Sequence, residues 1–560
     1  MKRYLITSAL PYINGIKHLG NMIGSILPAD VYARHLRQQG EEVLYICGTD
    51  EHGTPAEIAA ETVGESVQSY CDRLYEQQKA IYSQFEISFD YFGRSSAPEN
   101  HHLTQEVFKA LDENGFIEAR EIQQIYSNTD QRFLPDRYVE GTCPHCEYEK
   151  ARGDQCESCG RLLETTDLVN PRSAISGSQD LEIRSTHHLF LKLQNLAPEV
   201  QEWVSQHENW PAITQGIAHK WLNEGLHERC ISRDLKWGVK IPKPDFENKV
   251  FYVWFDAPIA YISMTQEWAK AHGQPESWKK WWLETGDQVS YAQFMAKDNI
   301  PFHAIFWPAM MLGTRQDWKL ADDIKGFSWL TYEGGKFSTS QQRGVFTDVA
   351  LELFPADYWR YYLLSNAPES ADSDFTFEHF ASVVNKDLAD VLGNFVNRVT
   401  TLVKKYSDNR VPELQVLDEN ETLRSQVKFL LEELDHSLRI MKFRQAAQTL
   451  RSLWVLGNEY ITTSEPWKVA KVDLPRALNI LRNCLELIRV FAIASSSFMP
   501  TTSRKLFEIL GETSDPASKP FLQIIGLQSL PINQELHPHS NLFVKIDEDQ
   551  VEQLKQRFQG

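Results

Sequence analysis

A short apolar strand followed by a tight turn and a helix start constrains this 560-residue chain most strongly. Tyr4–Thr7 reads as a strand, and residues 11–15 supply the Pro, Asn and Gly of a turn. This order places a phosphate at a helix N-terminus. We expect His18 and Asn21 to act as donors at that terminus, while Gly20 leaves room for a base and a ribose.

A second segment far downstream has the composition of a nucleotide-closing loop. Residues 333–340 combine two glycines with Lys336, Ser338 and Thr339. A glycine-hinged loop with a cation and hydroxyls can close over a triphosphate. Each segment is weak evidence alone, but together and in this order they predict one nucleotide-activating site.

The two segments, HLGN and KFSTS, resemble the ATP-binding signatures of class I aminoacyl-tRNA synthetases. The surrounding sequence resembles the methionyl-tRNA synthetase family from about residue 3 to about residue 500. The landmarks are Ala9–Tyr12, Cys47–Thr54, Tyr252–Pro258, Lys297–His303 and Pro466-Trp467. The variants HLGN, GTDEHGT and KDNIPFH look most similar to the archaeal and eukaryotic branch of that family.

Composition places further bounds on the chain. No run approaches 18 apolar residues, so no membrane span is expected, and the start leads directly into a strand. A cytoplasmic enzyme is therefore expected. The net charge of −19 predicts modest, specific tRNA binding rather than strong non-specific affinity for nucleic acid.

A cysteine cluster predicts a metal site. Two CxxC pairs, separated by nine residues, supply the ligands Cys143, Cys146, Cys156 and Cys159. Four thiolates suit one tetrahedral zinc ion and leave no open position, so the zinc is expected to be structural. His145 is a possible competing ligand, and a disulfide is disfavoured in a reducing compartment.

The pattern of elements predicts an α/β fold: a split Rossmann-like class I synthetase domain with a zinc-knuckle insertion, followed by an all-α anticodon-binding helix bundle. The insertion reads as polar and loop-rich, and Phe251–Phe255 reads as a buried strand. Helical spacing of apolar residues begins near residue 390. The expected boundaries are 1–115 and 231–326 for the two catalytic halves, 116–230 for the insertion, 327–389 for the KFSTS loop and stem-contact region, 390–536 for the bundle and 537–560 for a tail that packs back on the body.

The resemblance implies a reaction and assigns roles. A methionine carboxylate attacks the α-phosphate of Mg²⁺-bound ATP, and the acyl group then passes to the 3′ end of methionine tRNA. His18, Gly20, Asn21, Lys336, Ser338 and Thr339 would bind ATP, with His18, Asn21 and Lys336 catalytic. Asp50 would hold the substrate amino group. The side-chain pocket would consist of Leu10, Tyr12, Trp254, Ala257, Pro258, Tyr261, His303 and Trp307. Without the resemblance, such an aromatic-rich set is more often core than pocket.

One position departs from the family pattern. Thr339 stands where the family's second loop lysine stabilises charge in the transition state. Two readings are open: Arg343 supplies the cation as a further catalytic residue, or the activity is weakened or altered. We favour compensation by Arg343, because the rest of the site is intact.

Three residues match the family's positions for reading the CAU anticodon. Asn394 and Arg398 are spaced one helical turn apart, and Trp467 follows Pro466 at a loop-to-helix junction. An exposed aromatic ring with amide and guanidinium groups suits recognition of single-stranded bases. The competing reading for a Trp in a helix bundle is core packing.

Other enzymes and other classes of protein remain as alternatives. Leucyl, isoleucyl and valyl synthetases carry longer editing insertions, and the insertion expected here has a zinc knuckle instead. Because Thr339 replaces the second lysine of the loop, a second alternative remains: a paralogue that adenylates an amino acid or binds tRNA without serving translation. We expect a monomer, because the chain stops soon after the bundle.

Overall fold

A five-stranded parallel sheet organises the N-terminal part of the molecule, in the order β16-β15-β1-β2-β3. Its strands are β1 (Arg3–Ser8), β2 (Glu42–Thr49), β3 (Tyr91–Arg94), β15 (Val289–Ala296) and β16 (Asp323–Phe327). The structure is a computed structural model that describes residues 2–156, 158–159, 161–283, 288–339, 342–413, 419–524, 527, 529–538 and 541–558. The parallel pairing of these strands confirms the predicted Rossmann-like sheet.

The order of the strands reverses on either side of β1. Strands β2 and β3 follow on one side, while β15 and β16, from much later in the chain, lie on the other. In doubly wound sheets, ligands bind at such a reversal, beyond the carboxyl ends of the strands. Here Ala9 N donates to Phe294 O at 2.8 Å, and Asp50 directly follows β2. The landmarks Ala9–Tyr12 and Cys47–Thr54 therefore meet at one edge of the sheet.

Helices cover this sheet and connect its strands. They are α1 (Leu19–Asn21), the π-helical turn η1 (Met22–Ile26), α2 (Leu27–Gln38), α3 (Thr54–Val63), α4 (Val67–Gln84), α5 (Pro98–Glu113), α6 (Leu193–Ser205), α7 (Ala212–Glu224), α8 (Val253–Asp256), α9 (Ala260–Ala271), α10 (Lys279–Trp282), η5 (Phe302–Phe306) and α11 (Trp307–Gly313). The prediction of a strand over Phe251–Phe255 was wrong. Only Val250–Phe251 is a strand, β14, and α8 begins at Val253. A short aromatic and β-branched run does not distinguish a buried strand from a buried helical turn.

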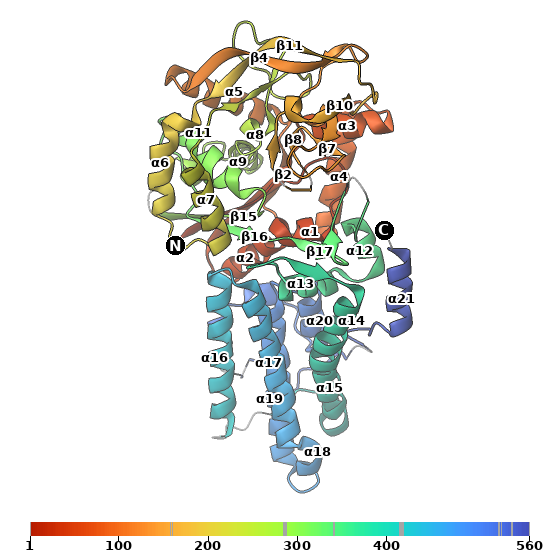
Figure 1. Cartoon of the computed structure of the whole chain (residues 1–560). Helices are drawn as coiled ribbons and strands as arrows, with labels where there is room; N and C mark the ends of the chain where they lie inside the picture. The colour runs from red at the N-terminus through yellow and green to blue at the C-terminus, as the bar shows by residue number, and fades with distance from the viewer. Residues whose placement is uncertain are drawn as a thin grey trace.

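The insertion lies at the far end of the catalytic part, at the top of Figure 1. Its frame is an antiparallel pair of long strands, β4 (Ile117–Ser127) and β11 (Leu181–Leu191). Small sheets beneath it carry the cysteines, formed by β6 (Val139–Thr142), β7 (Ala151–Arg152), β8 (Asp154–Gln155), β9 (Leu162–Leu163) and β10 (Val169–Ser173). The sequence reads as loop-rich here because the exposed faces of β4 and β11 carry polar side chains.

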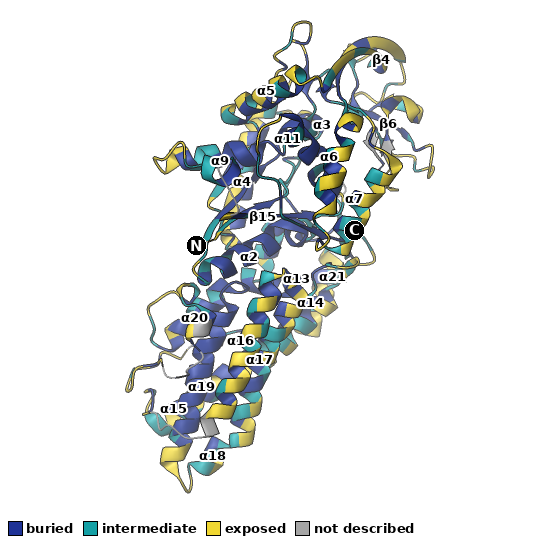
Figure 2. Ribbon diagram, turned by 90° about the vertical axis from the view of Figure 1, so that its left-hand side faces the viewer, coloured by how far each residue is buried: buried dark blue, intermediate teal, exposed yellow. Residues whose placement is uncertain are grey.

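The C-terminal part is a bundle of long helices that extends away from the sheet (Figure 1). It comprises α15 (Asn394–Ser407), α16 (Glu419–Arg439), α17 (Phe443–Ser464), α18 (Pro466–Val469), α19 (Leu474–Ser495) and α20 (Pro500–Ile509). Figure 2 shows their buried inner faces and exposed outer faces. The predicted helical spacing of apolar residues is confirmed in α16, where Val427, Leu431, Leu434 and Leu438 form a buried stripe.

Between sheet and bundle lie β17 (Leu330–Tyr332), β18 (Gly335–Lys336), β19 (Ser373–Phe375), α12 (Thr347–Leu353), α13 (Ala356–Ser365), α14 (Phe377–Val383) and the π-helical η6 (Val384–Gly393). Arg360 on α13 is fully buried and fixes the junction. Its guanidinium donates to Asp30 Oδ2 at 2.7 Å on α2 and to the carbonyl oxygens of Ser497 at 2.7 Å and Phe498 at 2.8 Å. The bundle is therefore joined to the sheet through a paired internal charge.

The tail packs back on the body, as predicted. Tyr358 Oη accepts from Val544 N at 2.8 Å, and Asn385 Oδ1 accepts from Ile546 N at 2.8 Å. Helix α21 (Glu548–Arg557) follows, and Tyr332 Oη donates to Phe558 O at 3.0 Å.

Candidate active site and tRNA-binding surface

His18 caps the helix that follows β1. Its Nδ1 accepts from Asn21 N at 3.3 Å, while Asn21 Oδ1 accepts from His18 N at 3.2 Å. Burial lowers the pKa of His18 to about 3, helped by the Lys17 charge, so the ring is neutral. Because Nδ1 accepts, the ring proton lies on Nε2, which leaves an N–H donor for a ligand. Asn21 Oδ1 is used in this cap, while its Nδ2 donates no hydrogen bond among the described residues and can serve as a second donor.

The KFSTS region is bound to the HLGN region through backbone and ring contacts. Leu19 N donates to Val345 O at 3.1 Å, and Thr347 N donates to Lys17 O at 2.8 Å. The Phe337 ring stacks on His18, with centroids 4.7 Å apart and planes 20° apart. The structure therefore brings the two predicted nucleotide segments together.

The charged and polar groups of this loop point in different directions. Lys336 is exposed, with Nζ 3.5 Å from Ser158 O of the cysteine-bearing insertion. Arg343 donates to Lys336 O at 2.8 Å and packs over the Tyr332 ring. Ser338 N and Arg343 O are 3.1 Å apart, so Ser338 and Arg343 pair as a bridge. Ser340, the last residue of the motif, lies outside the described residues.

Thr339 lies against the turn that precedes His18. Gly15 has a φ of +142°, a conformation that favours glycine, and a Cβ placed there would lie 3.2 Å from Thr339 Cγ2. The uncharged loop position thus approaches the Asn14–Lys17 turn with a methyl group.

Asp50 presents a buried carboxylate at the carboxyl end of β2. The residue is 5% exposed, and its Oδ1 has no hydrogen-bond partner among the described residues. Burial raises the pKa of Asp50 well above its usual range, and the Asp256 and Glu51 carboxylates raise it further. A buried, under-partnered carboxylate of this kind attracts a cationic group such as an amine.

The predicted side-chain pocket contains a fixed Tyr–His pair. His303 Nδ1 donates to Asn299 O at 3.0 Å, so its Nε2 accepts from Tyr261 Oη at 3.1 Å. Burial lowers the pKa of His303 to about 4, which keeps the ring neutral. Trp307 is buried with its ring edge-on to Tyr261, and Pro258 is also buried.

A cavity of about 100 Å³ is lined by Tyr12, Asn14, Trp254 and Asn299, among other residues. Of the predicted pocket residues, Tyr12 and Trp254 line this cavity, whereas Tyr261, His303 and Trp307 are not among its lining residues. Leu10 and Ala257 are half-buried, and they lie close in sequence to the lining residues Tyr12 and Trp254. Aromatic faces around a small cavity suit a thioether, whose sulfur–ring contacts are worth about 0.3–1.5 kcal/mol.

Two functional features were missed by the sequence reading. His52 Nδ1 and Asp256 Oδ2 form a buried pair at 2.7 Å behind the site, supported by Asn100 Nδ2 at 3.4 Å from the same oxygen. Lys17, immediately before His18, is also buried. Nothing in the local sequence marks either Lys17 or Asn100 as a buried residue of the site.

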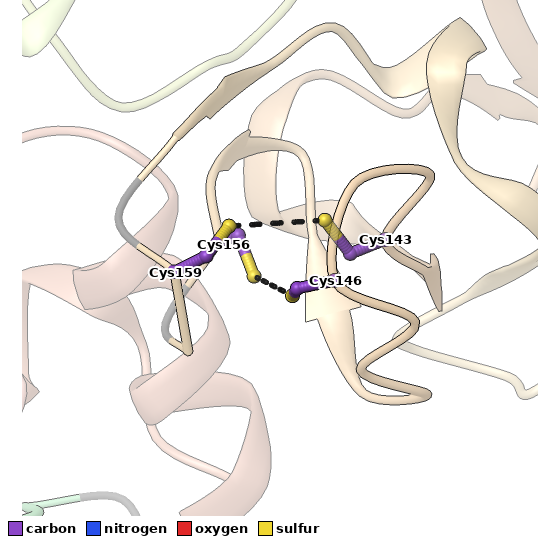
Figure 3. Close-up of side chains that lie close together, drawn as sticks. All are labelled: Cys143, Cys146, Cys156 and Cys159. Carbon is purple, nitrogen blue, oxygen red and sulfur yellow. Dashed lines mark hydrogen bonds between the residues drawn. The ribbon is translucent and has the colours of Figure 1, made fainter.

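The four cysteines of the insertion converge (Figure 3). Their sulfurs all lie within 4.8 Å of one another, with Cys143–Cys159 at 4.0 Å and Cys146–Cys156 at 3.7 Å. A tetrahedral site with Zn–S bonds of about 2.3 Å has sulfurs about 3.8 Å apart. The cluster could therefore hold one metal ion, and the donor set fits zinc.

The three predicted anticodon residues lie on the bundle. Arg398 Cζ is 5.6 Å from the centre of the Trp467 ring, and its Nη1 and Nη2 are each 3.4 Å from Thr462 Oγ1. Trp467 is half-buried rather than enclosed in the core, and Asn394 is exposed one turn before Arg398. Helix α18, which carries Trp467, lies at the end of the bundle farthest from the sheet (Figure 1).

Comparisons with known proteins agree with this arrangement. Residues 4–400 match the family described as tRNA synthetases class I (M), and residues 411–560 match the anticodon binding domain of methionyl tRNA ligase. The chain belongs to the methionyl class I tRNA synthetases. No helix among the described residues has the length and apolar character needed to cross a membrane.

Relatives match over full length. The methionine–tRNA ligase of Streptomyces avermitilis is 53% identical, and methionine–tRNA ligase 1 of Acaryochloris marina is 54% identical, with all of each chain covered. These relatives are bacterial, so the expected likeness to the archaeal and eukaryotic branch is not supported. The fold is shared with Mycobacterium tuberculosis methionyl-tRNA synthetase bound by methionyl-adenylate, with a TM-score of 0.77, 23% identity, and coverage of 97% of this chain and 100% of that one.

Proposed function

We propose that the chain activates methionine with ATP, releases pyrophosphate, and transfers the methionyl group to the 3′ end of methionine tRNA, releasing AMP. The observation that carries this proposal is the buried, under-partnered Asp50 carboxylate beside the joined HLGN and KFSTS segments. A carboxylate there can hold the amino group of methionine while donors from the two segments hold the phosphates.

Roles follow for the individual residues. His18 Nε2–H and the Asn21 amide would donate to ATP, with Gly20 leaving space for the nucleoside and with Ser338, Thr339 and Lys336 contributing from the loop. Leu10, Tyr12, Trp254, Ala257, Pro258, Tyr261, His303 and Trp307 would surround the methionine side chain. Mg²⁺ would accompany ATP as part of the substrate.

We assign the cysteine cluster to one structural zinc ion held by Cys143, Cys146, Cys156 and Cys159. Thiolates fill a tetrahedral shell and leave no position for substrate, so the ion would stabilise the insertion rather than react. The contact of Lys336 with Ser158, which lies between two ligands, would connect that stability to the loop.

At the other end, Trp467 would stack on an anticodon base while Asn394 and Arg398 donate to base edges of CAU. Stacking of one base on an aromatic ring is worth about 1–3 kcal/mol. We also propose a monomer, domain boundaries as predicted above, and a cytoplasmic location, where ribosomes use the charged tRNA.

Methionine-dependent ATP–pyrophosphate exchange by the purified protein, followed by charging of a CAU-anticodon tRNA, tests the proposal. Activity in both assays is expected. Exchange without charging would favour the adenylating paralogue, an alternative that the full-length identity to named ligases does not favour.

The role of Arg343 needs its own test. If its guanidinium compensates for Thr339, Arg343→Gln should lower the rate of ATP–pyrophosphate exchange by about 100-fold. Its present bond to Lys336 O means that it would have to turn toward ATP on binding. Unchanged exchange in Arg343→Gln would remove it from the catalytic set.

A further inference from the structure

Lys17 is a buried cation at the end of the Asn14–Lys17 turn, which precedes His18. It is 4% exposed and directly precedes His18. Its carbonyl oxygen accepts from both Thr347 N at 2.8 Å and Thr347 Oγ1 at 2.9 Å. These two bonds anchor the backbone of Lys17 to the start of α12.

The ammonium group has unused hydrogen-bonding capacity. Among the described residues, Lys17 Nζ donates one hydrogen bond, to Asn14 Oδ1 at 2.8 Å, although an ammonium carries three N–H donors. Asn14 itself lines the cavity of the site. Burial lowers the pKa of Lys17 to about 7, and the nearby Asp50 carboxylate opposes this shift. An under-bonded buried cation points to an anionic ligand that completes its shell.

The other cations of the two nucleotide segments face elsewhere. Lys336 is exposed toward Ser158, and Arg343 donates to Lys336 O. Thr339 is uncharged, and its methyl group lies closest to Gly15 of the turn. Arg233, on the cavity wall, is paired with Asp136 at 2.7 Å. Lys17 is therefore the cation that the turn itself holds beside His18.

We propose that Lys17 is a catalytic residue whose ammonium group donates to a non-bridging oxygen of the ATP α-phosphate during amino-acid activation. This inference rests on the proposed function. With the methionine amino group on Asp50, the carboxylate and the phosphorus that it attacks must lie close to Asp50. The turn that holds Lys17 is joined to Asp50, because Ile13 N donates to Asp50 O at 2.9 Å and the Lys17 ammonium donates to Asn14, the next residue.

The step balances without proton transfer from Lys17. A carboxylate oxygen forms a bond to the α-phosphorus, and the bond to the β-phosphate oxygen breaks, with its electron pair leaving on pyrophosphate. Lys17 keeps its proton and stabilises the charge that builds on the α-phosphate oxygens. The incoming phosphates favour the charged ammonium and so restore its protonation at neutral pH.

Lys17→Met tests this role, since Met keeps the length and apolar stem but removes the charge. We expect kcat of ATP–pyrophosphate exchange to fall by about 100- to 1,000-fold. The Kd for methionine, followed by tryptophan fluorescence, should change less than about threefold. Lys17→Arg should recover part of kcat. Lys428→Met, an exposed change on α16, is the matched control and should leave exchange unchanged.

The outcomes separate the possible roles. Exchange by Lys17→Met within threefold of wild type overturns the proposal. A raised Kd for methionine with unchanged kcat would also overturn it, because Lys17 would then serve only to balance Asp50. If Lys17→Met fails to fold, Lys17→Gln and Lys17→Arg give the same comparison of kcat with Kd. Inactive wild-type enzyme would instead overturn the proposed function.

Discussion

The two ends of the molecule prepare their ligand sites in opposite ways. At the sheet edge, Asp50 and Lys17 are buried and have few hydrogen-bond partners among the residues that the structure describes. At the end of the bundle, Arg398 lies over Trp467 and Asn394 is exposed to solvent. The catalytic end stores charge where water is excluded, so small changes there have large effects on rate. The bundle end uses solvated groups, whose replacement costs less.

Removal of the metal should destabilise the molecule most, and the loss of stability should be confined to the cysteine-bearing insertion. Binding of a structural zinc contributes on the order of 10 kcal/mol to a small domain. We expect a strong chelator to release one zinc per chain, measured with a colorimetric zinc indicator, and to expose residues 143–161 to protease. The bundle should stay protected. Cleavage of both ends at equal rates would contradict the separation of the two regions.

Asp50→Asn should come next in size. Loss of one partner of a buried charge pair costs about 2–5 kcal/mol, so kcat/KM for methionine in exchange should fall by at least about 30-fold. Because burial raises the pKa of Asp50, the ionised form destabilises the fold as pH rises through that pKa. The Asn variant should thus be no less heat-stable at pH 7. Glu76→Gln, on an exposed position of α4, is the control.

Trp467→Ala tests the bundle end, where a change should affect charging of the tRNA but not ATP–pyrophosphate exchange. We expect charging of a CAU-anticodon tRNA to lose about 1–3 kcal/mol in kcat/KM, with exchange unchanged. Lys468→Ala, next in the chain and exposed, should leave both assays near wild type. A parallel loss of exchange would mean that Trp467 supports the fold rather than the RNA.

The smallest effect concerns acid sensitivity. The pKa of His303 is lowered to about 4, so the unfolded chain takes up a proton near pH 6.5 that the folded chain does not. Folding stability is therefore lost as pH falls from 6.5 toward 4, by about 1 kcal/mol per pH unit. In urea titrations at pH 6.5 and 5.5, His303→Gln should lose about 1 kcal/mol less than wild type. His18, His35 and His101, whose pKa values are also lowered by burial, add to the slope in the same direction.

Local patterns predicted the parts of the site in which neighbours in sequence are neighbours in space. The His18 cap and the α15 spacing of Asn394 and Arg398 belong to this group. Prediction failed where the outcome depends on how a segment packs in the folded chain. A run such as Phe251–Phe255 does not reveal its helix, and nothing in the sequence places the Arg343 guanidinium on Lys336 O. Lysine is normally a surface residue, so the burial of Lys17 was not expected either.

The buried Arg360 has a consequence for how an RNA must fit. A swing of the bundle about the sheet would separate this guanidinium either from Asp30 or from the carbonyl oxygens of Ser497 and Phe498, at a buried position. The span between the aminoacylation end and the anticodon end is accordingly a fixed dimension of the protein. An RNA that carries the right three bases at the wrong distance from its acceptor end can occupy one site or the other, but not both at once.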